Sequence, residues 1–406
     1  MADILVIGAG MAGIATALSL QARGHTVRVV DRRGPGEETS HGNAGVIQAE
    51  ARAPYAMPRD LGTLVRYALG RSNDLRLDPL ALPGAARALM AYYRHSAPSR
   101  HQAATRTYSA LIARATRDHG KLSAEAGAEQ LIRRTGLGEI IDRPADFETR
   151  ARTAERLASE YGLTLRVVDG AALAAEEPAL RPTSAGAVLW DDSWSSPDPA
   201  ALVQSYAALF IRRGGELLRS EVRTISESEQ GWRLSTEKGP LKAEHLVVAL
   251  GPWSPAMLRQ LGYRIPMVMK RGYHGHFAME DQLGRPYLLA DHGVVLSSMT
   301  RGLRITTGAH LARAGAKHDF RQLEHGTDAA RIILDIGDAV PDSLWQGTRP
   351  CMPRMLPMVG QAPRHARLWF NFGHGHQGFT LGPTTGEILA DILDGRRDAL
   401  TAALAP

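Results

Sequence analysis

Three glycines near the start of the chain, Gly8, Gly10 and Gly13, have the spacing G-x-G-x-x-G. In this pattern the first glycine permits a tight turn, the second lets the backbone approach a pyrophosphate, and the third allows a helix to pack closely on a strand. A helix that begins here would offer free N–H groups and the positive end of its dipole to phosphates. Asp31 follows at about the distance expected of an acid that holds a ribose hydroxyl. These residues predict a dinucleotide site.

The elements that would position these residues can be predicted from the surrounding pattern. Residues 3–31 indicate an apolar strand, a glycine-rich turn, a helix and a second apolar strand that ends at Asp31. Residues 368–395 are predicted to form a strand, a glycine turn and a helix that begins near 383–385. Because these two units lie at opposite ends of the chain, we expect a Rossmann-like cofactor domain built from separated segments.

Helices and short strands are predicted between the two ends. Residues 60–135, 146–161 and 318–339 are predicted to be mostly helical, and 198–214 a helix with Asp198 as its N-cap. Residues 263–310 contain the short alternating stretches typical of an antiparallel sheet. We therefore predict a mixed α/β (α+β) fold with an inserted antiparallel-sheet substrate domain. The predicted boundaries are 1–80, 149–262 and 346–406 for the cofactor domain, and 81–148 and 263–345 for the substrate domain.

The composition is typical of a globular protein without a disulfide framework. The chain has 406 residues, of which 44% are hydrophobic and 22% charged, and its lone cysteine, Cys351, excludes an internal disulfide. The histidines lack a metal-ligand spacing such as H-E-x-x-H, so we predict no metal. The net charge of +6 is dispersed along the chain. Nucleic-acid binding is therefore not expected, whereas a peripheral contact with an anionic membrane surface is compatible with the charge.

The location of the protein is predicted from two features of the sequence. The start of the chain lacks a charged segment followed by a cleavable apolar stretch, as a secretory signal would have. No apolar run reaches the ~18 residues that span a bilayer. We expect a cytoplasmic protein, with peripheral contact at the inner membrane as an open alternative.

Further features favour FAD over NAD as the dinucleotide. A second glycine-rich loop, 40–45, follows soon after Asp31 and is suited to wrapping a cofactor. An apolar strand ends at Gly251, where the backbone could pass close to a ligand. The glycine-dense turn 372–379 leads into a helix whose N-terminus could lie beside a reduced, anionic flavin. No second fingerprint for NAD is present.

The chain resembles the glycine oxidase and D-amino acid dehydrogenase family of FAD-dependent amine oxidoreductases over nearly its whole length. The resemblance rests on the fingerprint with Asp31 and on the motifs at 38–45, 247–251, 347–350 and 373–376. It implies non-covalent FAD. The cofactor-binding residues that it implies are Gly8, Gly10, Gly13, Asp31, Arg32, Ser40, His41, Asn43, Ala44, Gly45, Val222, Gly251, Gly375, His376, Gln377, Gly378 and Phe379.

The resemblance also implies where the substrate binds. Arg349 resembles the arginine that holds a substrate carboxylate, and the guanidinium fork matches a carboxylate through two hydrogen bonds. The alternative is that Arg349 belongs to a buried structural ion pair. His274 and His276 alternate along a predicted strand with Tyr273, and we expect Tyr273 or His276 to lie near the substrate.

The chain departs from its relatives at two places. Residues 351–357 are rich in Met and Pro, which is closer to the D-hydroxyproline and secondary-amine members than to those with an acidic turn. Loop 46–50 lacks the tyrosine of many D-amino acid dehydrogenases, so their substrate contacts do not transfer. Cys351 does not fall at the position of the covalent flavin link of sarcosine oxidases, and we expect it to be a buried, inert thiol.

The implied reaction removes two electrons from a Cα–N bond. The Cα hydrogen leaves as hydride to flavin N5, and the resulting imine of a D-amino acid or cyclic secondary amino acid is hydrolysed to a keto acid unless it is cyclic and stable. Quinone and oxygen stay open as electron acceptors, although we favour a dehydrogenase over an oxidase. The alternative function is the flavin subunit of a heteromeric amine dehydrogenase complex.

Overall fold

A six-stranded sheet forms one half of the molecule in the computed structural model, which describes residues 1–70, 72–313 and 315–406. All neighbouring strands in it are parallel except the pair β20–β21. Its strand order is β20 (Met358–Gln361), β21 (Leu368–Phe372), β13 (His245–Val248), β1 (Asp3–Ile7), β2 (Thr26–Asp31) and β9 (Glu216–Arg219). The strands come from separated parts of the chain, as predicted.

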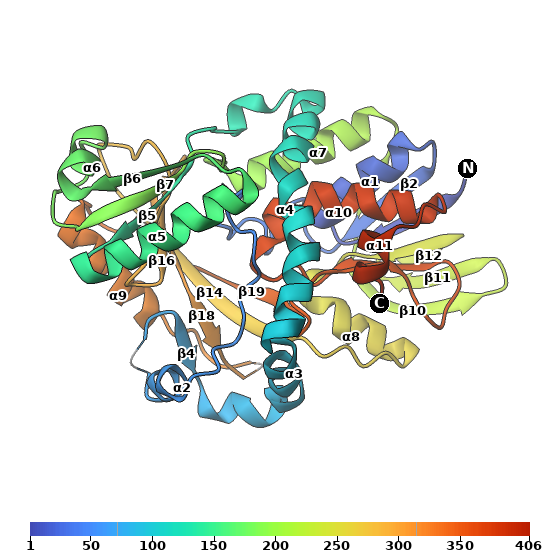
Figure 1. Cartoon of the computed structure of the whole chain (residues 1–406). Coiled ribbons are helices and arrows are strands. Elements are labelled where there is room, and N and C mark those ends of the chain that lie inside the picture. Colours follow the sequence, from blue (N-terminus) through green and yellow to red (C-terminus); the bar gives the residue numbers. More distant parts are fainter. Residues whose placement is uncertain (71, 314) are drawn as a thin grey trace.

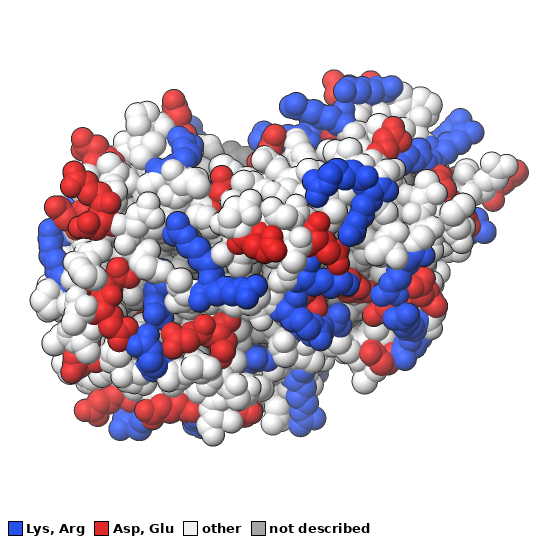
Figure 2. Space-filling view, turned by 90° about the horizontal axis from the view of Figure 1, so that it is seen from above, with Lys and Arg blue, Asp and Glu red and all other residues white. Residues whose placement is uncertain are grey.

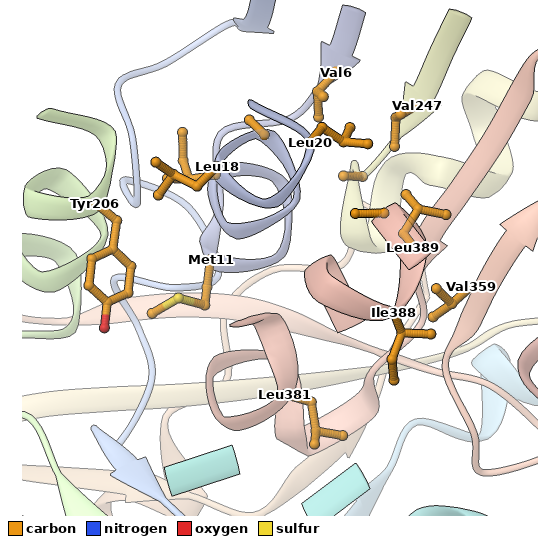
Figure 3. Close-up of a cluster of buried hydrophobic side chains, with 14 of the residues drawn as sticks. Val6, Met11, Leu18, Leu20, Tyr206, Val247, Val359, Leu381, Ile388 and Leu389 are labelled. Carbon is orange, nitrogen blue, oxygen red and sulfur yellow. The ribbon is translucent and has the colours of Figure 1, made fainter. Parts of the chain in front are cut away.

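Both faces of this sheet are buried, which explains why residues 4–7 of β1 are all apolar. Ile4 and Val6 face a core shared with helices α1 (Met11–Ala22), α7 (Pro199–Arg212) and α10 (Gly378–Leu393). Figure 3 shows part of this core. Leu5 and Ile7 face the opposite core, which includes side chains of the small sheet β10 (Val222–Ser228), β11 (Gly231–Thr236) and β12 (Gly239–Ala243).

Glycines let α10 approach α1 closely. A Cβ on Gly382 would lie 2.5 Å from the side chain of Met11, and one on Gly386 would lie 2.8 Å from the backbone of Ala15. The two helices therefore pack almost backbone to backbone. This contact ties the C-terminal part of the chain to its N-terminal part (Figure 1).

The prediction that the C-terminal helix begins near 383–385 is wrong, because α10 begins at Gly378 and carries Pro383 inside it. A proline inside a helix leaves the carbonyl four residues earlier without its N–H partner. Here that carbonyl belongs to Phe379, and it accepts a hydrogen bond from Nε2 of the buried His119, at 2.9 Å. Burial lowers the pKa of His119 to about 4, so it supplies this bond as a neutral ring.

A ten-stranded, mostly antiparallel sheet forms the other half of the molecule, and the antiparallel pairing predicted within 263–310 is confirmed. Strand β19 (Trp345–Cys351) pairs with β14 (Val268–Phe277) beside the main path. The path runs through β4 (Leu75–Leu77), β18 (Ala309–Leu311), β14, β17 (Gly302–Thr307), β16 (Val294–Met299), β15 (Tyr287–Leu289), β5 (Leu137–Ile141), β7 (Gly186–Trp190) and β6 (Leu165–Asp169).

Helices cover both halves, and α4 (Pro98–Ala126) crosses the middle of the molecule in Figure 1. The predicted N-cap of α7 is confirmed, since the Asp198 carboxylate accepts a hydrogen bond from the Ala201 N–H at 3.0 Å. The remaining elements are α2 (Leu61–Ala68), α3 (Leu82–His95), α5 (Pro144–Tyr161), α6 (Gly170–Glu176), α8 (Ser254–Leu258), α9 (Arg321–Ile333), α11 (Ala399–Leu404) and the strand pair β3 (Val46–Ile47) with β8 (Trp194–Ser195).

The segments of the chain do not divide cleanly between the two halves of the molecule. Strands β6 and β7, from segment 149–262, join the ten-stranded sheet, and α4, from segment 81–148, packs against α10 and α7. Segments 149–262 and 81–148 therefore each contribute to the half of the molecule to which the predicted boundaries do not assign them.

The surface carries both signs of charge, interspersed on the face shown in Figure 2. Among residues 1–70, 72–313 and 315–406, no helix is both long and apolar enough to cross a membrane.

Candidate functional site

One large cavity, of about 1000 Å³, lies where the carboxyl ends of β1, β2 and β13 meet β14, β17 and β19. It brings together most of the residues predicted from the sequence. The predicted residues on its wall are Gly8, Gly10, Asp31, Arg32, Ser40, Asn43, Ala44, Val222, Tyr273, Gly251, Arg349, Gly375, His376, Gly378 and Phe379. The structure places Gly13, His41, Gly45, Gln377 and His276 behind this wall.

The three glycines of the fingerprint have different structural requirements. Gly8 has φ +113°, and a Cβ there would lie 2.5 Å from the carbonyl oxygen of Ala249. A Cβ on Gly13 would collide with the carbonyl of Gly8, so this glycine allows the helix to pack on the turn. A Cβ on Gly10 would meet only Ser40 Oγ, at 3.4 Å, so the missing side chain leaves room on the cavity side. This cradle at the start of α1 fits a pyrophosphate.

Asp31 ends β2 with its carboxylate at the cavity wall. One carboxylate oxygen accepts from the Ala9 N–H at 2.7 Å and the other from the Arg33 N–H at 2.8 Å. Burial raises the pKa of Asp31, while these two N–H groups oppose the shift. The next residue, Arg32, stacks over the ring of Trp253 at 4.5 Å, which builds one side of this end of the cavity. A carboxylate fixed in this way fits a ribose hydroxyl.

The backbone of the 41–45 loop is held from behind by Arg304 of β17. Its guanidinium donates from Nη1 to the carbonyl oxygens of His41, at 2.9 Å, and Asn43, at 2.6 Å. Its Nε donates to Nε2 of His276 at 3.1 Å. Arg304 is only 4% exposed, and burial lowers its pKa to about 10, so it is a cation at neutral pH. Arg304 and His276 therefore fix the loop rather than contact the cavity.

The carbonyls of Gly42 and Ala44 in this loop are bound by side chains of the ten-stranded sheet. Gly42 accepts from Nδ1 of His274 at 3.3 Å, and Ala44 accepts from Ser297 Oγ at 2.9 Å. His274 in turn stacks on Trp345, with ring centroids 5.1 Å apart. Four consecutive carbonyls are thus engaged by the ten-stranded sheet, which sets the position of the loop relative to the cavity.

The two candidate substrate residues of β14, His276 and Tyr273, have different surroundings. Burial, followed by the charge of Arg304, lowers the pKa of His276 to about 3, so it is a neutral acceptor for Arg304. Tyr273 contributes to the cavity wall, but its hydroxyl bonds Nδ1 of His310 at 2.8 Å and its ring packs edge-on against Phe320. The Tyr273 hydroxyl is therefore engaged by His310, and His276, whose Nδ1 has no partner in the described residues, does not line the cavity.

Arg349 enters the cavity by crossing over β14. Its Nη1 donates to the carbonyl of Gly308 at 2.6 Å and its Nη2 to that of Thr307 at 2.8 Å. In the described part of the chain no carboxylate lies within 4.0 Å of it, so the structural ion pair considered above is absent there. Burial lowers the pKa of Arg349, and an anion in the cavity would oppose that effect. The remaining N–H groups of the fork fit a carboxylate.

The path of Arg349 depends on Gly272. A Cβ at this position would lie 2.5 Å from Arg349 Nη1. We expect Gly272→Ala to displace the guanidinium and to raise KM for the substrate about 10-fold, as one charge-assisted hydrogen bond is worth about 1.5–3 kcal/mol, with flavin content unchanged. Gly275→Ala on the same strand is the control, because its Cβ would meet only the ends of flexible side chains. Equal KM values for wild type and Gly272→Ala would contradict this role.

The cavity also contains residues that the sequence reasoning missed. Tyr55 is 59% exposed and borders the cavity, with its ring 5.3 Å from that of His376. Its backbone carbonyl accepts from the hydroxyl of Tyr92, which anchors the loop on α3. A tyrosine among prolines soon after the 40–45 loop was the signal that could have revealed it.

A buried polar network stands behind the cavity at Glu50. Its carboxylate accepts from Ser193 Oγ and from Gln48 Nε2, and Gln48 also accepts from the predicted cofactor residue Gln377. Burial raises the pKa of Glu50, which opposes its ionisation. Gln377 thus acts on the cavity through Gln48, which lies on the wall.

The raised pKa of Glu50 predicts a pH-dependent stability. An acid whose folded pKa lies above its unfolded pKa loses stability as pH rises from the unfolded to the folded value, by about 1.4 kcal/mol per pH unit. We expect Glu50→Gln to match wild type in thermal unfolding at pH ~4, below the ordinary glutamate pKa, and to unfold at a higher temperature at pH ~8. Glu229→Gln, at an exposed turn, is the control. A difference that does not change with pH would contradict the prediction.

Two other predicted features can be placed. Cys351 is partly buried at the end of β19, and burial raises the pKa of its thiol. Outside residues 71 and 314, no three His, Cys, Asp or Glu side chains are grouped so that they could hold a metal ion.

Comparison with known proteins identifies relatives along the whole chain. The sequence model described as FAD dependent oxidoreductase matches residues 3–392. The chain is 33% identical over 417 residues to a protein of Paramagnetospirillum magneticum named D-amino acid dehydrogenase, covering 98% of this chain and 96% of that relative. It is 26% identical over 412 residues to a protein of Bradyrhizobium diazoefficiens named D-amino-acid oxidase, covering 98% and 97%.

Solved structures share the fold. Glycine oxidase from Geobacillus kaustophilus superposes with a TM-score of 0.74 at 19% identity, covering 100% of this chain and 98% of that one. L-proline dehydrogenase from P. horikoshii gives a TM-score of 0.74 at 16% identity, covering 100% and 96%. These matches confirm the predicted mixed α/β architecture.

Proposed function

The chain belongs to the family of FAD dependent oxidoreductases, and from this premise we propose that it oxidises a D-amino acid or a cyclic secondary amino acid. Its relatives of 33% and 26% identity are named D-amino acid dehydrogenase and D-amino-acid oxidase. The proposal favours a dehydrogenase, and the Met- and Pro-rich segment 351–357 favours secondary amines such as D-hydroxyproline.

The observation that carries this proposal is the environment of Arg349. The guanidinium lies in the cavity, is held by two backbone carbonyls and has no acidic partner within 4.0 Å in the described residues. A buried cation without a counter-ion is unfavourable unless a ligand provides one. An amino acid carboxylate provides that charge and is oriented by the fork.

The residues present fit FAD. Gly8, Gly10 and the start of α1 would hold the pyrophosphate, and Asp31 the adenosine ribose. The 41–45 loop and the turn before α10 would lie along the rest of the cofactor. When bound, FAD supplies the acceptor for the hydride that leaves Cα. We propose that it is held without a covalent bond, so acid precipitation should release all of the flavin.

The chain's own residues bind the substrate and set its protonation. Arg349 would fix the carboxylate and so limit the positions that Cα can take. Burial, followed by the charges of Arg349 and Lys270, lowers the pKa of His376 well below its usual range, so this wall residue is neutral. The same two cations disfavour an ammonium group nearby and favour the neutral amine that can release hydride.

The test is anaerobic reduction of the purified protein by a panel of D-amino acids, D-hydroxyproline, proline, glycine and sarcosine. We expect one group of substrates to bleach the visible band of the flavin rapidly. Slow return of colour in air, and fast return with a quinone, would support the dehydrogenase. A flavin-loaded protein that no amine bleaches would contradict the proposed function.

We further propose that quinone reduction occurs at a membrane surface touched by α2. This helix exposes Leu61, Val65 and Leu69, one turn apart, with Arg66 beside them. An exposed apolar stripe with a cation fits an anionic bilayer. Co-flotation with anionic vesicles, and its loss in Val65→Asp, is the expected result, and no flotation of the wild type would contradict it.

A further inference from the structure

A second cation, Lys270, lies beside Arg349 in the cavity. The two residues are direct partners in the antiparallel pair β14–β19, which places them on the same face of the sheet. Both contribute to the cavity wall. Like charges directly opposite each other on neighbouring strands are destabilising. A protein that keeps both needs a compensating anion at this place.

Residues 1–70, 72–313 and 315–406 do not supply that anion. Within the described residues, Lys270 Nζ has neither an ion pair nor a hydrogen bond, and it lies over the ring of Tyr92, 5.0 Å from the ring centroid. Around it the wall is apolar, with Leu89 and Leu311. Asp74, also on the wall, is engaged with Ser72 Oγ and packs beside Gly293 instead.

Arg271, the next residue along β14, is a cation whose N–H groups do have hydrogen-bond acceptors. Arg271 points to the opposite face and donates to the carbonyl oxygens of Ala316 and Arg313, each at 2.9 Å. Arg349 likewise has two carbonyl partners. Lys270 has none of these contacts in the described structure, although it is half-buried on the cavity wall beside apolar side chains. Keeping an unpaired ammonium there is costly without a ligand.

We propose that Lys270 binds a second carboxylate, so that the enzyme accepts dicarboxylic amino acids. One carboxylate would lie at Arg349 and the other at Lys270, with the amine and Cα between the two anchored ends. A lysine suits the distal group because its compact charge on a flexible stem tolerates side chains of different length. This inference rests on the proposed function and narrows its substrate class.

The reaction at Cα is unchanged by this assignment. The second carboxylate neither gains nor loses electrons, and its contribution is binding and orientation. Lys270 is therefore a specificity-determining residue, and its removal should act on substrates according to the charge of their side chain.

The first experiment compares D-glutamate with its neutral isostere D-glutamine in holoenzyme. We expect Lys270→Met to lower kcat/KM for D-glutamate about 10- to 100-fold, the loss of one hydrogen-bonded charge pair, and to change kcat/KM for D-glutamine less than about 2-fold. Lys242→Met, on exposed β12, removes the same charge away from the cavity and is the control. Equal losses on both substrates would overturn the proposal, since Lys270 would then serve the carboxylate that all substrates share.

The second experiment does not depend on turnover. Glutarate and butyrate, a dicarboxylate and a monocarboxylate, are titrated into the flavin-loaded protein while its visible spectrum is recorded. We expect glutarate to bind more tightly than butyrate in wild type and equally in Lys270→Met. Equal binding of the two in wild type would overturn the proposal. If no amino acid reduces the flavin but glutarate is still preferred, the proposed function fails and the second anion site stands.

Discussion

The Arg349→Ala variant is expected to keep its flavin and to raise KM for every amino acid substrate by about 100-fold or more. A carboxylate held by the fork gains two hydrogen bonds to a charged group, each worth about 1.5–3 kcal/mol, and both are lost. The carbonyls of Thr307 and Gly308 that Arg349 leaves behind border the cavity and can take water instead, so the fold should survive.

Steady-state kinetics and flavin content measure this effect. Arg349→Lys is the informative companion, because it keeps the charge but loses the fork, and we expect an intermediate KM. Arg271→Ala removes a neighbouring arginine from the opposite face of β14 and controls for charge. Wild-type KM in Arg349→Ala would show that the carboxylate binds elsewhere. Loss of flavin in that variant would instead assign Arg349 to the cofactor.

The parts of the fold that were predictable are those in which neighbours in sequence determine the structure. The strand, turn and helix of residues 3–31 are predictable because β1 pairs with β2 and Gly13 packs on Gly8, both within this segment. The N-cap Asp198 was also predictable, because its carboxylate accepts from an N–H only three residues away. The start of α10 was not, because the bond that compensates for Pro383 comes from His119, far away in sequence.

The orientation of side chains on β14 needed the three-dimensional structure. Alternation along a strand shows that Tyr273 and His276 face opposite sides, but not which side borders the cavity. His276 is hydrogen-bonded to Arg304, and Tyr273 to His310. Nothing in the sequence links the members of these pairs. Lys270 was missed for the same reason, since its position opposite Arg349 is set by the register of β19.

Substitution of Arg304 is the second change for which we expect a large effect, on FAD affinity and on stability. In Arg304→Gln, the carbonyls of His41 and Asn43 and the ring of His276 lose a shared charged donor in a buried place. Each unsatisfied group costs about 1–3 kcal/mol, and the sum is large enough to release the 41–45 loop. We expect FAD affinity to fall about 100-fold or more and the unfolding temperature to drop.

If Arg304 positions the 41–45 loop as well as stabilising the fold, the properties of the bound flavin should change in its variants. The loop that Arg304 holds borders the cavity at Asn43 and Ala44, so flavin that still binds to Arg304→Gln should show a shifted reduction potential and visible spectrum. Arg304→Lys, which keeps the cation but not the fork, should recover part of both, whereas Arg301→Gln, at the exposed turn before β17, should leave them unchanged. A variant that loses stability but binds FAD with wild-type affinity and potential would limit Arg304 to the packing of the two halves. If FAD affinity and reduction potential change together, then the ten-stranded sheet, through Arg304, holds the 41–45 loop in the position that FAD requires. The buried cation would then explain how two interleaved halves build one site.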